Sequence, residues 1–112
     1  MLEQIKKIVE GCSADPSVVA CAVYKVDGTP IVTNIKGKEY LSILQWLEDL
    51  VKILLRQIFE GSLRNVEFRM LDYSMLIFPL SRSLALIIVC TSDASLYKLK
   101  IDVESFRGRL NV

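Results

Sequence analysis

Few residues in this sequence have the type and spacing that catalysis or metal binding requires. The chain of 112 residues contains no histidine, which excludes a Ser-His or Cys-His dyad and an imidazole metal site within it. Its three cysteines, Cys12, Cys21 and Cys90, lie far apart and form no Cys-x-x-Cys pair, which excludes a zinc knuckle and a thioredoxin-type motif. Because Cys21 and Cys90 lie in strongly apolar segments, we expect buried, reduced thiols and no metal or other cofactor.

The acidic residues are also better explained by structure than by catalysis. Asp27 is followed by Gly28, a pair typical of a tight turn. Glu48 and Asp49 are adjacent, and on a helix their side chains diverge by about 100°, which does not suit paired acid–base catalysis. The phosphate-binding motifs GxxxxGK[ST] and GxGxxG are missing from the sequence. We therefore predict no intrinsic catalytic activity.

The composition indicates a folded domain with more apolar surface than one chain needs. Hydrophobic residues make up 52% of the sequence and the formal net charge is +1, which excludes disorder and gives no electrostatic footprint for nucleic acid. The longest segment without a charged residue is Ser83–Ser92, well short of the ~20 residues of a membrane-spanning helix. The first residues do not resemble a signal peptide, so we expect a cytoplasmic protein whose excess apolar surface is covered by a partner chain.

The hydrophobic pattern predicts one α+β domain over residues 1–112. Helices are expected at Leu2–Gly11, Lys38–Glu60 and Asp93–Val112, and strands at Val18–Lys25, Pro30–Ile35, Leu63–Leu71, Tyr73–Leu80 and Ser83–Thr91. The first, fourth and fifth strands are almost continuously apolar, which is typical of interior strands. The second begins with proline and the third alternates apolar with polar residues, so both are expected at sheet edges. Short connections favour a mostly antiparallel sheet.

The long helix Lys38–Glu60 carries much of the apolar excess. Its apolar residues cover an arc of about 220–240°, whereas a surface helix needs a stripe only somewhat wider than about 100°. We therefore expect its own sheet to cover one side, and a second copy or another protein to cover the other. Trp46 lies at the border of the apolar arc, where it could anchor an interface or form the rim of the core.

The sequence resembles the roadblock family of dynein-light-chain-like domains over residues 2–110. The resemblance is carried by VVACAVYKVDGTPIV (Val18–Val32), by the long helix ending at Phe59-Glu60-Gly61, and by the strand block Val66–Cys90. It implies a five-stranded antiparallel sheet in the order 2-1-5-4-3 within a three-layer α/β/α sandwich, the first and last helices on one face and the long helix on the other. Longin and other profilin-like folds share part of this element order and remain alternatives.

The resemblance also implies how such a domain works. Roadblock-like domains dimerise through the long helix and the third strand, and act as non-catalytic platforms for Ras-like small GTPases or as dynein accessory chains. Carried over by position, the dimer interface comprises Tyr40, Leu44, Leu47, Val51, Leu54, Leu55, Ile58, Val66, Phe68 and Met70. The candidate partner surface is the polar stripe of the helix, with Trp46 beside it: Ser42, Gln45, Trp46, Asp49, Lys52 and Arg56.

Three functional hypotheses follow. The first is a homodimeric scaffold that binds a Ras-like small GTPase and could modulate its nucleotide cycle; Arg56 or Arg64 could act in trans on that GTPase, although solvated surface arginines are the simpler explanation. The second is a longin-like adaptor or a dynein-type accessory light chain without a GTPase partner. The third is a small-molecule sensor of the profilin-like kind, which would need a pocket. Scarce asparagine and abundant Ile, Leu and Val favour a prokaryotic source.

Overall fold

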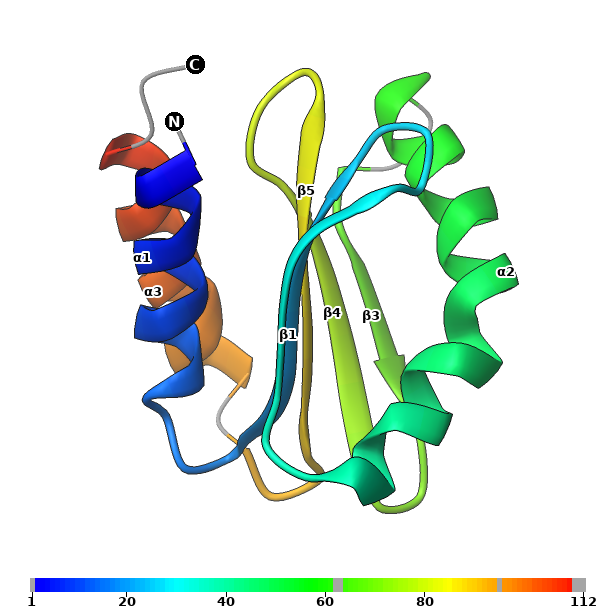
Figure 1. Ribbon diagram of the computed structural model, residues 1–112, viewed down its shortest axis with the longest axis vertical. Coiled ribbons are helices and arrows are strands. Elements are labelled where there is room, and N and C mark those ends of the chain that lie inside the picture. The colour runs from blue at the N-terminus through cyan, green and yellow to red at the C-terminus, as the bar shows by residue number, and fades with distance from the viewer. Residues whose placement is uncertain (1, 62–63, 95, 110–112) are drawn as a thin grey trace.

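In the computed structural model, the described residues are 2–61, 64–94 and 96–109, of which residues 44, 46–48, 50 and 106–109 are described by backbone only. They form helices separated by a group of two strands and a group of three strands (Figure 1). The elements are α1 (Leu2–Ser13), β1 (Val18–Lys25), β2 (Pro30–Ile35), the 3₁₀ turn η1 (Lys38–Tyr40), α2 (Leu41–Phe59), β3 (Val66–Arg69), β4 (Tyr73–Pro79), β5 (Leu84–Thr91) and α3 (Leu96–Arg109).

The strands form one antiparallel sheet in the order β2-β1-β5-β4-β3. The three continuously apolar strands β1, β5 and β4 occupy its middle, where side chains on both faces are buried. β2 and β3 lie at the two edges, and their residues are exposed or half-buried. The predicted strand order and the predicted edge strands are therefore confirmed.

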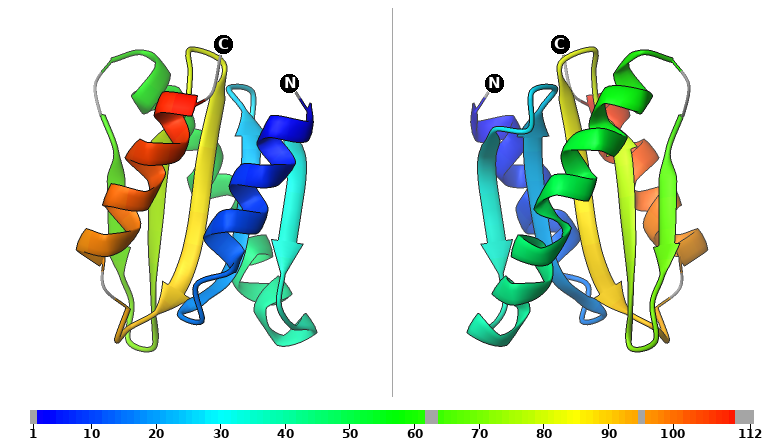
Figure 2. Two further views of the ribbon diagram at one scale, coloured as in Figure 1. Left: turned by 90° about the vertical axis from the view of Figure 1, so that its left-hand side faces the viewer. Right: turned by 90° about the vertical axis from the view of Figure 1, so that its right-hand side faces the viewer.

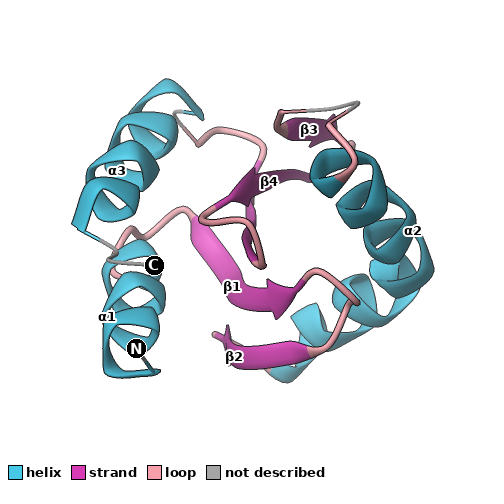
Figure 3. Ribbon diagram, turned by 90° about the horizontal axis from the view of Figure 1, so that it is seen from above, coloured by secondary structure: helices cyan, strands magenta, loops and turns pink. Residues whose placement is uncertain are grey.

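Helices cover both faces of the sheet, which gives three layers (Figure 3). α1 and α3 lie side by side on one face, and α2 crosses the other face diagonally from the β2 side to the β3 side (Figure 2). Each face has its own apolar core, one with α1 and α3 and one with α2. This is the three-layer arrangement that the sequence resemblance implied.

α1 continues two residues beyond its predicted end at Gly11, to Ser13. Its buried residues Ile5, Ile8, Val9 and Cys12 recur at helical spacing, so the side packed on the sheet includes a residue beyond the glycine. Packing of Cys12 therefore outweighs the helix-ending preference of Gly11.

β3 is shorter than the predicted strand Leu63–Leu71. In its register with β4, Val66 lies opposite Ile77, so extension to Arg64 would place that residue opposite Pro79. Proline has no amide hydrogen for a ladder bond, and β3 begins only at Val66. Residue 63 of the predicted strand lies outside the described residues.

Asp15 connects the loop between α1 and β1 to α3 and to the segment that follows β2. One carboxylate oxygen accepts hydrogen bonds from the Ser17 hydroxyl (2.7 Å) and the Ser17 amide (2.9 Å), and the other from the Lys98 ammonium (3.4 Å). The Asp15 carbonyl accepts a bond from the Lys36 ammonium at 2.8 Å. The Ser17 hydrogen bonds lower the pKa of Asp15 below its usual value, since they favour the ionised carboxylate.

Candidate docking surface on α2 and β3

The polar residues predicted as a partner surface form one stripe along α2. They recur every three or four residues, which places them on one side of the helix. The side chains of Ser42, Gln45, Asp49, Lys52 and Arg56 are all exposed. The predicted Trp46 side chain lies outside the described residues. The structure therefore presents this stripe to solvent.

The stripe adjoins a groove between α2 and the β1–β2 turn. The groove has a volume of about 560 Å³ and is lined by Val26, Asp27, Lys52, Arg56, Phe59 and Glu60. Gly28 closes the turn with a φ of +91°, a conformation that glycine adopts without a steric penalty. The Lys52 side chain packs over this glycine, so that a Cβ there would come within 2.7 Å of Lys52 Cγ. The turn and the helix thus meet through Lys52.

Asp27 stabilises the β1–β2 turn and is not a candidate catalytic base. Its carboxylate accepts a hydrogen bond from the Thr29 amide at 2.9 Å. Hydrogen bonds from Thr29 lower the pKa of Asp27 below its usual value, because they favour the ionised form. A more acidic carboxyl is a weaker proton acceptor at neutral pH, which agrees with the turn role predicted from the Asp-Gly pair.

Beside the polar stripe, α2 has an apolar flank that the single chain leaves partly uncovered. Ile53 is 60% exposed and Leu41 is 43% exposed. Ile43 and Leu54 pack against the α2 core but are only half-buried. Isolated exposed aliphatic residues are common, but Ile43, Ile53 and Leu54 share one side of α2, within an arc of about 100°. Leu41 lies on the other side of the polar stripe. We define Ile43, Ile53 and Leu54 as the α2 flank.

Three predicted interface residues instead belong to the core of the single chain. Val51, Leu55 and Ile58 are buried between α2 and the sheet, and Leu55 has no exposed surface. They have almost no surface to offer a partner in the single chain, so the dimer proposed below does not use them. The side chains of Leu44 and Leu47 lie outside the described residues. Leu54 and Tyr40 are half-buried, and the Tyr40 ring packs edge-on against Tyr73 with centroids 5.9 Å apart.

β3 lies next to α2 and supplies the remaining predicted interface residues. It is an end strand, and within the described part of the chain it pairs with β4 alone. Val66 and Phe68, together with Met70 just beyond the strand, are half-buried on the α2 side of the sheet. On the opposite face, Glu67 forms an ion pair with Lys100 of α3. The outer backbone edge of β3 can therefore accept another strand.

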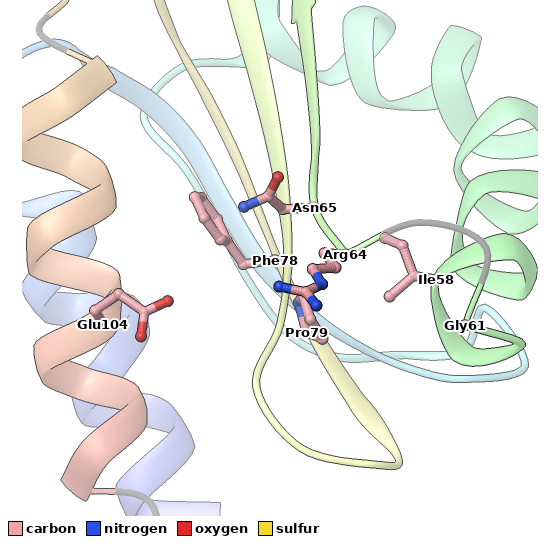
Figure 4. Close-up of a pocket in the computed structure, with 7 residues that line it drawn as sticks. All are labelled: Ile58, Gly61, Arg64, Asn65, Phe78, Pro79 and Glu104. Atoms are coloured by element: carbon pink, nitrogen blue, oxygen red, sulfur yellow. The ribbon is translucent and has the colours of Figure 1, made fainter.

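A second cleft lies at one end of the sheet and has no part in this surface. Its volume is about 590 Å³, and Ile58, Gly61, Arg64, Asn65, Phe78, Pro79 and Glu104 line it (Figure 4). Its described charged groups, Arg64 and Glu104, come from a loop and from α3. Arg64 thus borders this cleft and Arg56 borders the groove, so the two candidate arginines do not meet at one site.

The sequence pattern did not identify two contributors to the groove. Val26 is 43% exposed, and Phe59 is half-buried at the end of α2. The Asp-Gly turn signal indicated where the chain reverses, but the contact between this turn and α2 arises only from packing. Within residues 2–61, 64–94 and 96–109, no group of three His, Cys, Asp or Glu side chains is placed to hold a metal. No described helix is both long and apolar enough to cross a bilayer.

The strand order, the helices on both faces and the exposed long helix define the class of fold. The Roadblock/LC7 domain from Streptomyces avermitilis superposes with a TM-score of 0.67 at 9% identity, over 97% of this chain and 92% of that chain. MglB from Myxococcus xanthus gives 0.74 at 12% identity, over 96% and 84%. MglC from the same organism gives 0.67 at 17% identity, over 96% and 99%. The chain therefore has the roadblock/LC7 fold.

The sequence comparison gives the family itself. The family model described as AF0774-like protein matches residues 2–104. The chain belongs to this family. A comparison with curated protein sequences gives no match.

Proposed function

We propose that this protein is a homodimeric, non-catalytic platform that binds a Ras-like small GTPase. The observation that carries the proposal is the exposed apolar flank of α2, above all Ile53, beside the free edge strand β3. A small-GTPase partner is what the resemblance to roadblock-like domains implies.

The dimer combines two contacts related by one two-fold axis. In an isologous interface the same surface is used by both copies, so β3 pairs with β3 of the second copy and the two α2 flanks meet. Strand pairing gives hydrogen-bond partners to the unpaired backbone groups at the outer edge of β3. Contact between the two α2 helices removes Ile53 from water. Val66, Phe68 and Met70 lie on the face of the sheet that α2 covers, so both contacts lie on one side of the molecule. MglB, which has the same fold, is described in a tetrameric arrangement, a precedent for self-association.

The partner binds the polar stripe of α2 and the adjoining groove. Lys52 and Arg56 provide two cationic side chains one helical turn apart. The groove lining also includes two carboxylates, Asp27 from the β1–β2 turn and Glu60 at the end of α2. Mixed charges of this kind set the orientation and the association rate of a protein partner. The stripe lies beside the α2 flank, so the dimer leaves it accessible.

The test is a charge reversal with a matched control. Purified Ras-like GTPases loaded with a non-hydrolysable GTP analogue are titrated with wild type, with Lys52→Glu/Arg56→Glu, and with Lys6→Glu/Lys7→Glu. The control carries the same charge change at exposed residues of α1, on the opposite face of the sheet. We expect the first variant to lose at least roughly tenfold in affinity and the control to bind like wild type, with the dimer mass unchanged in both.

Two results contradict the proposal. Equal affinity of Lys52→Glu/Arg56→Glu and wild type, with the dimer intact, removes the stripe as the docking surface. Failure of every GTPase to bind the wild-type dimer removes the GTPase partner, and leaves an adaptor or an accessory chain as the function.

A further inference from the structure

The hydrogen-bond pattern of β3 determines how a second strand can pair with its outer edge. The ladder between β3 and β4 continues to Met70, whose amide donates a hydrogen bond to the Tyr73 carbonyl at 2.8 Å. In an antiparallel pair, residues that exchange both backbone bonds alternate with residues whose N–H and C=O groups point away from the partner. Phe68 therefore bonds β4, as Met70 does, and Glu67 and Arg69 direct their backbone groups outwards.

A two-fold axis allows few registers between two copies of this ladder, which spans residues 66–70. Outward-facing residues of one copy must lie opposite outward-facing residues of the other, so one residue lies opposite its own copy on the axis. That residue is Glu67, Phe68 or Arg69, because any other choice leaves at most one residue of the ladder facing the ladder of the second copy.

The axis at Phe68 pairs the whole ladder and sets opposite charges face to face. It places Glu67 of each copy opposite Arg69 of the other, with Cα atoms about 5.5 Å apart. Glu67 reaches Lys100 of α3, and Arg69, two residues further along the strand, lies on the same face of the sheet. Opposite charges across a strand pair stabilise it, whereas like charges destabilise it.

The other face of the ladder favours the same axis. Val66, Phe68 and Met70 are half-buried apolar residues on the α2 side. With the axis at Phe68, the two Phe68 side chains lie opposite each other, and Val66 of each copy lies opposite Met70 of the other. Every apolar residue of this face then has an apolar partner across the strand pair.

The two alternative axes produce mismatches on both faces. An axis at Glu67 sets the two Glu67 carboxylates opposite each other, and Met70 opposite Arg64. An axis at Arg69 sets the two guanidinium groups opposite each other, and the first residue of the ladder opposite Asp72. Like charges directly opposite destabilise a strand pair, so both axes are disfavoured.

We infer, on the basis of the proposed dimer, that Glu67 and Arg69 select a second copy of this chain as the partner of β3 and fix the register with Phe68 on the two-fold axis. An acid followed two residues later by a base complements itself in this register, so two copies form two opposite-charge pairs. Lys100 contacts Oε1 of Glu67, and a carboxylate accepts bonds at both oxygens. A chain with two like charges at these positions meets one repulsive pair and is rejected.

The experiment reverses the charges singly, together and in mixtures. Glu67→Arg or Arg69→Glu alone turns both pairs into like-charge pairs, and each is expected to raise the Kd of the homodimer about tenfold or more by sedimentation equilibrium. An equimolar mixture of the two single variants restores both pairs and is expected to form mainly the heterodimer, which native mass spectrometry identifies by its mass. The double variant Glu67→Arg/Arg69→Glu is expected to dimerise like wild type and to exclude wild type from its dimers.

The control Lys100→Gln removes the ion pair within the chain and leaves the charges of β3 unchanged, so it is expected to dimerise like wild type. Dimerisation in the mixture shows that both single variants are folded. If wild type is a dimer and the single reversals leave its Kd unchanged, the register is overturned and the proposed dimer stands. Preferential pairing of Glu67→Arg with wild type would move the axis to Glu67 and also overturn the register. A monomeric wild type would overturn both the register and the dimer.

Discussion

Ile53→Glu tests the α2 flank with little effect on the fold of the single chain. Ile53 is 60% exposed, and a surface substitution of this kind changes the free energy of unfolding by about 0.5 kcal/mol or less. In the proposed dimer the same side chain is buried. Full burial of an isoleucine contributes about 1.5–3 kcal/mol, so burial of the exposed part contributes about 1–2 kcal/mol per copy.

Two-fold symmetry doubles the effect, because both copies lose the side chain. The loss of about 2–4 kcal/mol raises the Kd of the dimer by about 30-fold to several hundred-fold. Desolvation of the introduced carboxylates adds to this loss. Sedimentation equilibrium over a concentration series measures the Kd directly.

The matched control is Ile101→Glu. Ile101 is an isoleucine on a helix with 52% of its surface exposed, but it lies on α3, which covers the opposite face of the sheet. The control is expected to dimerise like wild type. The reasoning is refuted if the two variants have the same Kd, or if Ile53→Glu dimerises as tightly as wild type.

Three further predictions concern stability, each measured by denaturant or thermal unfolding. Leu55→Ala creates a cavity under α2 and is expected to lower the free energy of unfolding by about 2–5 kcal/mol; a loss below about 0.5 kcal/mol would place this side chain outside the core. Gly28→Ala is expected to destabilise more than Gly61→Ala, because both glycines have positive φ but only the first is crowded by a neighbouring side chain; equal losses would contradict this. Asp15 has a folded-state pKa below its unfolded value, owing first to the hydrogen bonds from Ser17. Its ionised carboxylate therefore stabilises the folded state fully above the unfolded pKa, about 3.9. This stabilisation is lost as the pH falls through the folded pKa. Asp15→Asn is accordingly expected to cost about 1 kcal/mol at neutral pH and to make stability less dependent on pH below about 4; parallel pH profiles would refute the assignment.

Most of the fold could be predicted because the strand sequences differ in kind. β1, β4 and β5 are apolar at nearly every position, which requires cover on both faces, and the alternating β3 suits an edge. The ends of elements depended on partners that the local sequence does not reveal. Pro79 of the neighbouring strand β4 limits where β3 begins, because β3 extended to Arg64 would face it. Burial of Cys12 against the sheet extends α1 beyond Gly11.

The sequence placed the candidate surface on α2, but it did not predict which apolar residues of this helix face the sheet and which face a partner. An apolar arc of about 220–240° shows that a helix needs cover on more than one side, and does not show which apolar residues face the sheet. Leu55 and Ile53 are equally apolar in sequence, yet one is fully buried and the other is 60% exposed. The diagonal crossing of α2 over the sheet decides between them, and that angle results from packing of the whole core.

The mass of the protein in solution, measured by light scattering at micromolar concentration, tests the central claim most directly. The chain has a mass of 12.7 kDa, and the account predicts a particle of twice that mass whose dissociation is promoted by Ile53→Glu and not by Ile101→Glu. A particle of 12.7 kDa at that concentration would contradict the claim that the α2 flank and the edge of β3 form a dimer interface.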